Sequence, residues 1–209
     1  MGQLSTSAAA AWMAAFADVV HDQAGYLTQL DAAIGDADHG ANMDRGMKAV
    51  KALDAASFAN AGSYLKKAGM TLVSTVGGAS GPLYGTFLLR FAGALPTDDG
   101  ATAEQVGAAL RAGVEGIVAR GKAVVGDKTM VDALTPALAA YDEAVAGGGD
   151  TATGLAAAAA ASAQGRESTT PLVARKGRAS YLGERSAGHV DPGATSVTML
   201  LECAAETLG

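Results

Sequence analysis

Three aspartates crowd into one short stretch near the N-terminus of the chain. Asp31, Asp36 and Asp38 lie within eight residues, together with Gly35 and followed by Gly40. Two carboxylates 4 Å apart repel each other by about 4 kcal/mol at an effective dielectric constant near 20, so a compact cluster requires a cation. Oxygen donors alone favour a hard ion such as Mg²⁺ or Ca²⁺ over zinc. The spacing therefore predicts a metal site, although a solvated acidic loop has the same pattern.

Other metal and phosphate motifs do not fit the chain. Counting twelve positions from Asp36 puts Met47 where the calcium loop of an EF-hand requires a bidentate glutamate. Residues 188–195 have the glycine spacing of a P-loop, but Ala194 stands in the place of its lysine. Residues 116–123 keep the lysine and lack the hydroxyl that must follow it. Neither loop is a Walker motif.

A second candidate site is the glycine-rich turn at residues 75–81, which leads into a predicted helix starting near Ser80. The free N–H groups and the positive dipole end of a helix N-terminus can bind an anion such as phosphate. Many such turns bind nothing. A hydrolase nucleophile is excluded, because Pro82 stands where the Gly-x-Ser-x-Gly motif requires its second glycine.

A third candidate is the polar, glycine-punctuated segment 177–194, which is longer than ordinary connections between helices. Arg178 and Arg185 can pair with phosphate oxygens, with a neighbouring glutamate, or stay in solvent. His189 can contact a ligand, pair with Asp191, or be exposed. The residue types alone do not decide between these alternatives.

Eight helices are expected to position the three candidate segments. Apolar residues recur at helical spacing, and no strand-like alternation is sustained. Capping residues precede the apolar runs, and Thr102 with Gln105 has the spacing of a capping box. The predicted helices cover about residues 7–25, 42–53, 61–75, 80–95, 102–120, 130–146, 151–170 and 194–207. Short loops predict antiparallel packing of neighbours, and no linker divides the chain. We expect one all-α domain spanning residues 1–209.

Composition limits the possible partners and compartments. The 209 residues carry a net charge of −6, which argues against binding to a nucleic acid backbone. Cys203 is the single cysteine, which excludes an internal disulfide and suits a reducing compartment; its apolar surroundings predict burial. No signal peptide and no apolar stretch long enough to cross a membrane is visible. We expect a cytoplasmic protein.

Four segments together resemble the nucleotide-binding L subunit of dihydroxyacetone kinases. They are residues 30–43, 77–85, 126–134 and 177–194, which follow the order and the approximate spacing of that family. The resemblance implies an antiparallel eight-helix barrel with the nucleotide at one open end. This agrees with the helix count expected from periodicity.

The resemblance also implies roles for individual residues. Asp31, Asp36 and Asp38 correspond to the aspartates that hold two Mg²⁺ ions, which in turn grip the phosphates of ADP or ATP. The implied nucleotide contacts are His39, Gly40, Ala41, Asn42, Ala79, Ser80, Gly121, Met130, Arg178, Asp191, Pro192 and Gly193. Ala37 stands where the family usually has glycine, and a positive φ there would strain the metal loop. No general base is needed in this chain, because phosphoryl transfer depends mainly on charge neutralisation and alignment.

Partners follow from the same resemblance. Dihydroxyacetone is expected on a separate K subunit. In one form of these kinases K and L are fused and use ATP; in the other, a phosphohistidine protein of the phosphotransferase system rephosphorylates ADP bound to a free L subunit. A chain running from Met1 to Gly209 favours the second form. An ATP-exchanging kinase subunit for dihydroxyacetone or another small ketose, and a nucleotide-loaded adaptor of a transcription regulator, remain alternatives, and a homodimer is left open.

Overall fold

The computed structural model describes residues 4–98 and 100–208, and within them the fold is all-α. A single bridge between Leu4 and Ala101 is the strand-like contact in this part of the chain. None of the described helices combines the length and the apolarity that a membrane span requires. The elements are α1 (Thr6–Asp22), α2 (Ala24–Ile34), α3 (His39–Lys51), η1 (Ala55–Ser57), α4 (Ala61–Thr75), α5 (Ser80–Ala94), α6 (Ala103–Gly121), α7 (Met130–Ala146), α8 (Thr151–Ser168), η2 (Arg178–Ser186) and α9 (Pro192–Leu208), where η marks a 3₁₀ helix.

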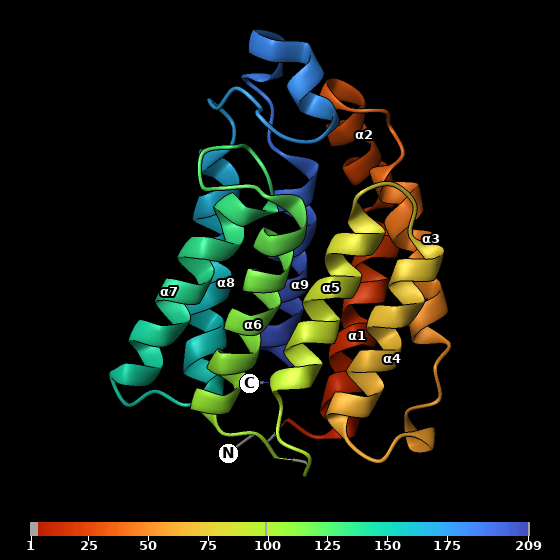
Figure 1. The fold of residues 1–209 in the computed structure, drawn as a ribbon, viewed down its shortest axis with the longest axis vertical. Coiled ribbons are helices and arrows are strands. Elements are labelled where there is room, and N and C mark those ends of the chain that lie inside the picture. The colour runs from red at the N-terminus through yellow and green to blue at the C-terminus, as the bar shows by residue number, and fades with distance from the viewer. Residues whose placement is uncertain (1–3, 99, 209) are drawn as a thin grey trace.

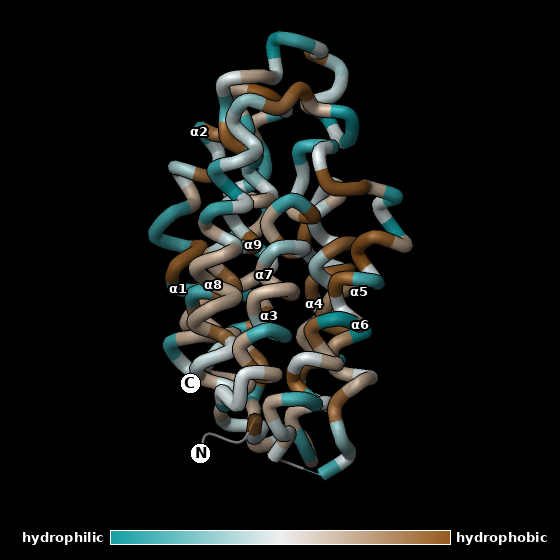
Figure 2. Tube along the Cα trace, turned by 90° about the vertical axis from the view of Figure 1, so that its left-hand side faces the viewer, coloured by the Kyte–Doolittle hydropathy of each residue, from teal (hydrophilic) through white to brown (hydrophobic). Residues whose placement is uncertain are grey.

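The α-helices other than α2 form a ring, in which each helix packs against the next. α1 packs against α3, each helix from α3 to α8 packs against the next, and α9 closes the ring by packing against both α8 and α1. At the upper end of the view in Figure 1 lie α2, η2 and the loops that join α4 to α5 and α6 to α7. This end therefore gathers all three segments that the sequence singles out. Figure 2 shows hydrophilic residues, in teal, on the loops above the helices.

Side chains at the helix starts explain why these helices begin where they do. In a capping box the first side chain accepts from a backbone N–H three residues on, and the side chain there bonds back to the first backbone N–H. Each such cap stabilises a helix by about 1 kcal/mol. The structure has capping boxes at α4, α6 and α7, formed by Asn60 with Ser63, Thr102 with Gln105, and Thr129 with Asp132. The box at Thr102, which the sequence predicts, is thus confirmed.

The N-terminal helices differ from the prediction. The chain continues as α2 directly after a break at Gln23, whereas the sequence predicted a loop before residue 42. α3 begins at His39 rather than Asn42, because the Asp31 carboxylate accepts hydrogen bonds from the backbone N–H groups of Asp38 and His39. A carboxylate from the preceding helix thus serves the first turn of α3, which has no side-chain cap of its own. The 3₁₀ helices η1 and η2 were also not predicted.

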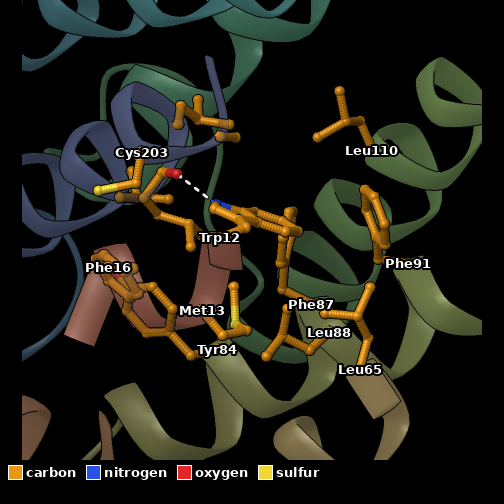
Figure 3. Close-up of a cluster of buried hydrophobic side chains, with 14 of the residues drawn as sticks. Trp12, Met13, Phe16, Leu65, Tyr84, Phe87, Leu88, Phe91, Leu110 and Cys203 are labelled. Carbon is orange, nitrogen blue, oxygen red and sulfur yellow. Dashed lines mark hydrogen bonds between the residues drawn. The ribbon is translucent and has the colours of Figure 1, made fainter. Parts of the chain in front are cut away.

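Aromatic side chains fill the interior of the ring, as Figure 3 shows. Trp12 packs 5.7 Å, centroid to centroid, from Phe91, and its indole N–H donates to the backbone oxygen of Leu200 at 2.8 Å. This hydrogen bond joins α1 to α9 and satisfies the one polar atom of the buried Trp12 side chain. Cys203 is buried in the same hydrophobic cluster, as the sequence predicts. The core below thus gives the loops at the upper end a rigid base.

Candidate functional site

A cavity of about 680 Å³ opens at the upper end of the ring. Its walls come from the end of α2 and the loop after it, the turn before α5, the start of α7, and the connection between α8 and α9. We call this connection, residues 169–191, the lid. The lining includes two sets of opposite charge: three aspartates on one wall and three basic lid residues, Arg175, Lys176 and Arg178.

The three aspartates predicted as metal ligands converge on one wall. Oxygens of Asp31, Asp36 and Asp38 all lie within 4.8 Å of one another. Asp31 is buried, and its Oδ2 accepts from the N–H groups of Asp38 at 2.8 Å and His39 at 3.1 Å. A Cβ at Gly35 would stand 2.0 Å from Asp31 Oδ1, so only glycine fits beside this carboxylate.

The chemistry of this cluster fits a hard divalent cation. Its donors are carboxylate oxygens only, which are the ligands that Mg²⁺ prefers. Arg178 Nε from the lid lies 3.0 Å from Asp36 Oδ2, and no other ion pair in the described part of the chain involves the three aspartates. One largely exposed guanidinium does not balance three carboxylates, so the cluster has room for further positive charge.

Ala37 adopts φ = 61° inside the same loop. This is the left-handed region, which glycine adopts freely and a residue with a Cβ does not. The backbone strain expected at Ala37 if its φ were positive is therefore present in the metal loop.

A buried chain of hydrogen bonds runs from His39 into the ring. One ring nitrogen lies 3.1 Å from Ser80 Oγ, and the other lies 2.8 Å from Ser196 Oγ, which is 2.7 Å from the Tyr84 hydroxyl. Burial lowers the pKa of His39, while the carboxylates of Asp31 and Asp38 oppose this shift. A neutral imidazole donates from one nitrogen and accepts at the other, so the ring can link the turn before α5 to α9.

The turn before α5 presents a free helix N-terminus to the cavity. Ala79 and Ser80 line the cavity, and α5 has no side-chain cap. A Cβ at Gly81 would stand 2.3 Å from the backbone oxygen of Val76, so this glycine lets the helix start fold tightly back on the turn. The unpaired N–H groups can bind an anion, as the sequence predicts for such a turn.

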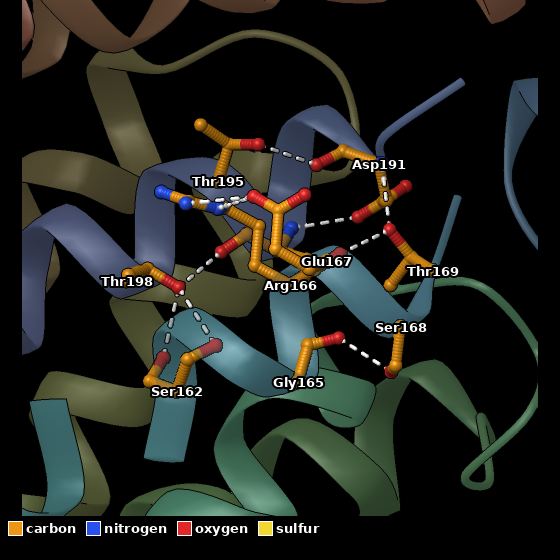
Figure 4. A network of polar contacts seen from close by, with 10 residues as sticks. Ser162, Gly165, Arg166, Glu167, Ser168, Thr169, Asp191, Thr195 and Thr198 are labelled. Atoms are coloured by element: carbon orange, nitrogen blue, oxygen red, sulfur yellow. Dashed lines mark hydrogen bonds and ion pairs between the residues drawn. The ribbon is translucent and has the colours of Figure 1, made fainter. Parts of the chain in front are cut away.

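A further part of the cavity wall is built at the starts of α7 and α9. Met130, Pro192 and Gly193 line it. Asp191 is buried, accepts from the backbone N–H of Ala194 at 2.7 Å and so caps α9, as Figure 4 shows. Burial raises the pKa of Asp191 to about 7, against the lowering effect of the Ala194 hydrogen bond and the Lys128 ammonium.

The structure brings most of the residues implied by the family resemblance to this cavity. Eleven line it: Asp31, Asp36, Asp38, His39, Ala79, Ser80, Met130, Arg178, Asp191, Pro192 and Gly193. Four do not line it: Gly40, Ala41, Asn42 and Gly121. Two of these lie next to lining residues, since a Cβ at Gly77 would stand 2.8 Å from Asn42 Oδ1 and one at Gly121 would stand 3.4 Å from Leu83. His189 is exposed.

Several lining residues escaped the sequence reasoning. Ile34 and Leu83 add apolar surface, and Lys128 and Thr129 also line the cavity. Ile34 also packs with Ala174, Ala179 and Leu182, so the lid rests on the end of α2 through a small apolar cluster. Helical periodicity could have identified Leu83 as a residue of the first turn of α5, but no local signal marks Lys128.

Comparison with known proteins places the chain in a family. Residues 33–206 match the model of the DAK2 domain. The chain belongs to the DAK2 domain family. This DAK2 domain is 45% identical over 192 residues to the ADP-binding subunit DhaL of the PEP-dependent dihydroxyacetone kinase of Escherichia coli, and the match covers 91% of each chain. It is 44% identical to the ADP-binding subunit of the PTS-dependent enzyme of Lactococcus lactis, over 94% of this chain and 95% of that one. The resemblance to the L subunit is thereby confirmed.

Solved structures agree with the fold of this DAK2 domain. The dihydroxyacetone kinase of C. freundii in complex with AMP-PNP and Mg²⁺ matches with a TM-score of 0.69 at 25% identity. The native form of that enzyme gives a TM-score of 0.70 at 26% identity. The match covers 96% of this chain but 34% of the C. freundii chain, so this DAK2 domain corresponds to about a third of that larger enzyme.

Proposed function

We propose that the chain is the nucleotide-binding subunit of a phosphoenolpyruvate-dependent dihydroxyacetone kinase. The observation that carries the proposal is the match along nearly the full length of both chains to ADP-binding subunits of such kinases. The convergent carboxylates and the free helix N-terminus that line the same cavity support it, because together they suit a magnesium-bound polyphosphate. Residues 1–209 would act as one domain, an antiparallel eight-helix barrel with the nucleotide at its open end.

The residues of the cavity divide the work of holding the nucleotide. Asp31, Asp36 and Asp38 would hold two Mg²⁺ ions, which neutralise phosphate charge and align the phosphates when bound. The N–H groups at Ala79 and Ser80 would donate to phosphate oxygens. Burial lowers the pKa of His39, and its ring nitrogen 3.1 Å from Ser80 Oγ would orient that hydroxyl. Gly40, Ala41, Asn42, Gly121 and Met130, with Asp191 to Gly193, would complete the nucleotide contacts.

The lid would close the site over the nucleotide. Arg178 is paired with Asp36 in the structure, and an exposed pair of this kind is worth about 1 kcal/mol or less. Its guanidinium can therefore exchange a carboxylate for a phosphate at little cost. Because fixed groups hold and align the phosphates, the chain needs no general base of its own.

Partners supply the remaining chemistry in this proposal. Dihydroxyacetone would sit on a separate K subunit, and a phosphohistidine protein of the phosphotransferase system would rephosphorylate ADP in place. The site would thus cycle between ADP and ATP without releasing either. Such a donor system works in the cytoplasm, which is where we expect the chain to act.

Nucleotide retention tests the proposal directly. The purified chain should carry tightly held ADP that exchanges slowly with excess labelled ATP during gel filtration. Rapid exchange would instead indicate an ATP-using kinase subunit. A chain confirmed to be folded that neither retains nor binds adenine nucleotide would refute the proposal.

Removal of single carboxylates tests the metal assignment. Asp36→Asn and Asp38→Asn should abolish phosphoryl transfer with Mg²⁺ as the only metal, while the helical content stays unchanged. Loss of one charge from a crowded cluster relieves repulsion rather than breaking packing. Asp22→Asn, which changes an exposed aspartate at the end of α1, should leave turnover intact. Wild-type turnover in either cluster variant would refute the assignment.

A further inference from the structure

Lys128 is a buried charge to which the proposed function gives no role. It is 1% exposed and lies in the loop between α6 and α7, with φ = 62°. A buried ammonium is costly unless hydrogen bonds replace its water. Burial lowers its pKa, while the carboxylates of Asp191 and Asp132 oppose that shift. None of the ion pairs in the described part of the chain involves Lys128, so backbone oxygens must compensate its charge.

Three backbone oxygens accept hydrogen bonds from the Lys128 ammonium. Lys128 Nζ donates to Thr169 O at 2.7 Å, to Thr170 O at 3.4 Å and to His189 O. Thr169 and Thr170 begin the lid, and His189 lies near its end. One side chain therefore holds both roots of a segment whose middle lines the cavity.

Further bonds join the same two roots to each other. The backbone N–H of Asp191 donates to Thr169 Oγ1 at 3.0 Å, which Figure 4 shows, and that of Gly188 donates to Thr170 O at 2.8 Å. The N–H of Arg175 donates to Asp127 O at 3.0 Å, so the lid is also tied to the residue before Lys128. Hydrogen bonds around Lys128 thus join three segments that are distant in the sequence: the loop before α7, the start of the lid and the end of the lid.

The middle of the lid is held much more weakly. It rests on α2 through the small cluster around Ile34 and through the exposed pair of Arg178 with Asp36. Gly183 interrupts η2 with φ = 55°. The lid thus combines firmly tied roots with a loosely held middle, which is the arrangement expected of a segment that opens about a fixed base.

We propose that Lys128 is a positioning residue that fixes both roots of the lid and thereby sets how slowly bound nucleotide leaves. The proposal rests on the proposed function, since it takes the cavity to hold a nucleotide. With the roots held, only the middle of the lid must move for release. Without the ammonium, the root at His189 loses its tie to Lys128, which loosens the end of the lid and the Asp191–Gly193 wall that follows it.

Lys128→Met is the informative variant, because methionine has about the length of the lysine stem but lacks the ammonium. It also keeps a residue with a Cβ at this left-handed backbone position, so the backbone strain is unchanged. Thr169 O and Thr170 O still accept from the N–H groups of Leu172 and Gly188, so the loss is confined mainly to the tie at His189. Lys122→Met is a matched control: Lys122 also has positive φ, at 53°, and lies in the same connection, but its side chain is exposed.

The measurement is the release of a fluorescent ADP analogue from the Mg²⁺-loaded full-length chain, chased with excess ADP. We expect Lys128→Met to release the analogue at least about tenfold faster with little change in the association rate, since such differences fall mainly on dissociation. Lys122→Met should match the wild type. Equal release rates in the wild type and Lys128→Met would overturn the proposal.

Hydrogen exchange in the unsubstituted, nucleotide-free chain gives a second test that does not depend on the variant folding. The amides of Gly188 and Asp191 should be protected from exchange before nucleotide is added, whereas the amides of residues 178–185 should gain protection on binding. Rapid exchange at both root amides would overturn the role of Lys128. If the wild type binds no nucleotide, the proposed function fails, and the protection of the roots still decides whether the lid is fixed as proposed.

Discussion

Ala37 combines a side chain with a backbone conformation that disfavours it. At φ = 61° a residue with a Cβ costs about 1–2 kcal/mol relative to its right-handed form, whereas glycine carries no such cost but loses about 0.5–1 kcal/mol of chain entropy. Ala37→Gly should therefore raise the free energy of unfolding by up to about 1 kcal/mol in urea titrations. Ala33→Gly, at an exposed position in the last turn of α2, should lower it by up to about 1 kcal/mol. Equal losses in both variants would show that Ala37 is unstrained.

Asp191 makes stability depend on pH. Its pKa is raised from its ordinary value near 4 to about 7, mainly by burial, with Lys128 and Asp132 as the charged groups acting on it. Between these values the unfolded chain releases the Asp191 proton and the folded chain keeps it. The contribution of Asp191 to the free energy of unfolding therefore falls as pH rises through this window and levels off above about pH 7.

Asp191→Asn removes this dependence while keeping an oxygen for the Ala194 N–H. In denaturant titrations of the nucleotide-free chain, the stability of the variant relative to the wild type should increase from about pH 4 to about pH 7 and then stay constant. Parallel pH profiles for the two proteins would contradict the raised pKa.

Single residues differ in how far the sequence reveals them. The three aspartates of the metal loop are close in sequence, so repulsion between them already predicts a cation. Lys128 gave no such signal, because its partners Thr169 and His189 lie 41 and 61 residues away. A buried charge satisfied entirely by distant backbone oxygens is visible only once the lid has folded.

At the scale of secondary structure, glycine sets how closely α5 approaches the turn that precedes it. A Cβ at Gly81 would stand 2.3 Å from Val76 O and 3.1 Å from Leu72 O, both backbone atoms that cannot move aside cheaply. Gly81→Ala should destabilise the chain by about 1–3 kcal/mol. It should also weaken nucleotide binding, because the helix start must shift away from the turn.

Gly93 provides the control on the same helix. A Cβ there would meet nothing within 4 Å, so Gly93→Ala should stabilise the chain by up to about 1 kcal/mol through helix propensity alone and leave nucleotide affinity unchanged. Thermal melting and calorimetric titration of both variants measure the two effects. Unaltered binding in Gly81→Ala would refute the role of this helix start.

Helices with local caps were predictable, and those whose limits depend on tertiary contacts were not. The sequence identified the start of α6 from Thr102 and Gln105, which satisfy each other within one turn. It missed α2 and placed the start of α3 three residues late, because Asp31 reaches across the loop to the N–H groups of Asp38 and His39. The lid was recognised as unusually long, but its 3₁₀ helix was not predicted.

At the scale of the whole molecule, the ring of helices acts as a support for loops at one end. The Trp12 to Leu200 bond and the aromatic core join the first and last helices, so the two walls of the cavity, from the N-terminal and C-terminal parts of the chain, stand on one base. Short loops and amphipathic periodicity predicted an all-α chain, which the structure confirms for the residues it describes. Short loops predicted that sequential neighbours pack together, whereas the closing of the helices into a barrel was implied by the family resemblance, because periodicity carries no information on which helices meet.

The central claim is that this cavity binds a magnesium-loaded nucleotide, and thermal melting of the nucleotide-stripped chain tests it most directly. A ligand at about 1,000 times its Kd adds about 4 kcal/mol, and each 1 kcal/mol raises the Tm of a chain of this size by about 2–4 °C. We therefore expect ADP with Mg²⁺ to raise the Tm by about 8–16 °C, and ADP with a chelator to raise it far less. No rise with any adenine nucleotide, or an equal rise without Mg²⁺, would contradict the account.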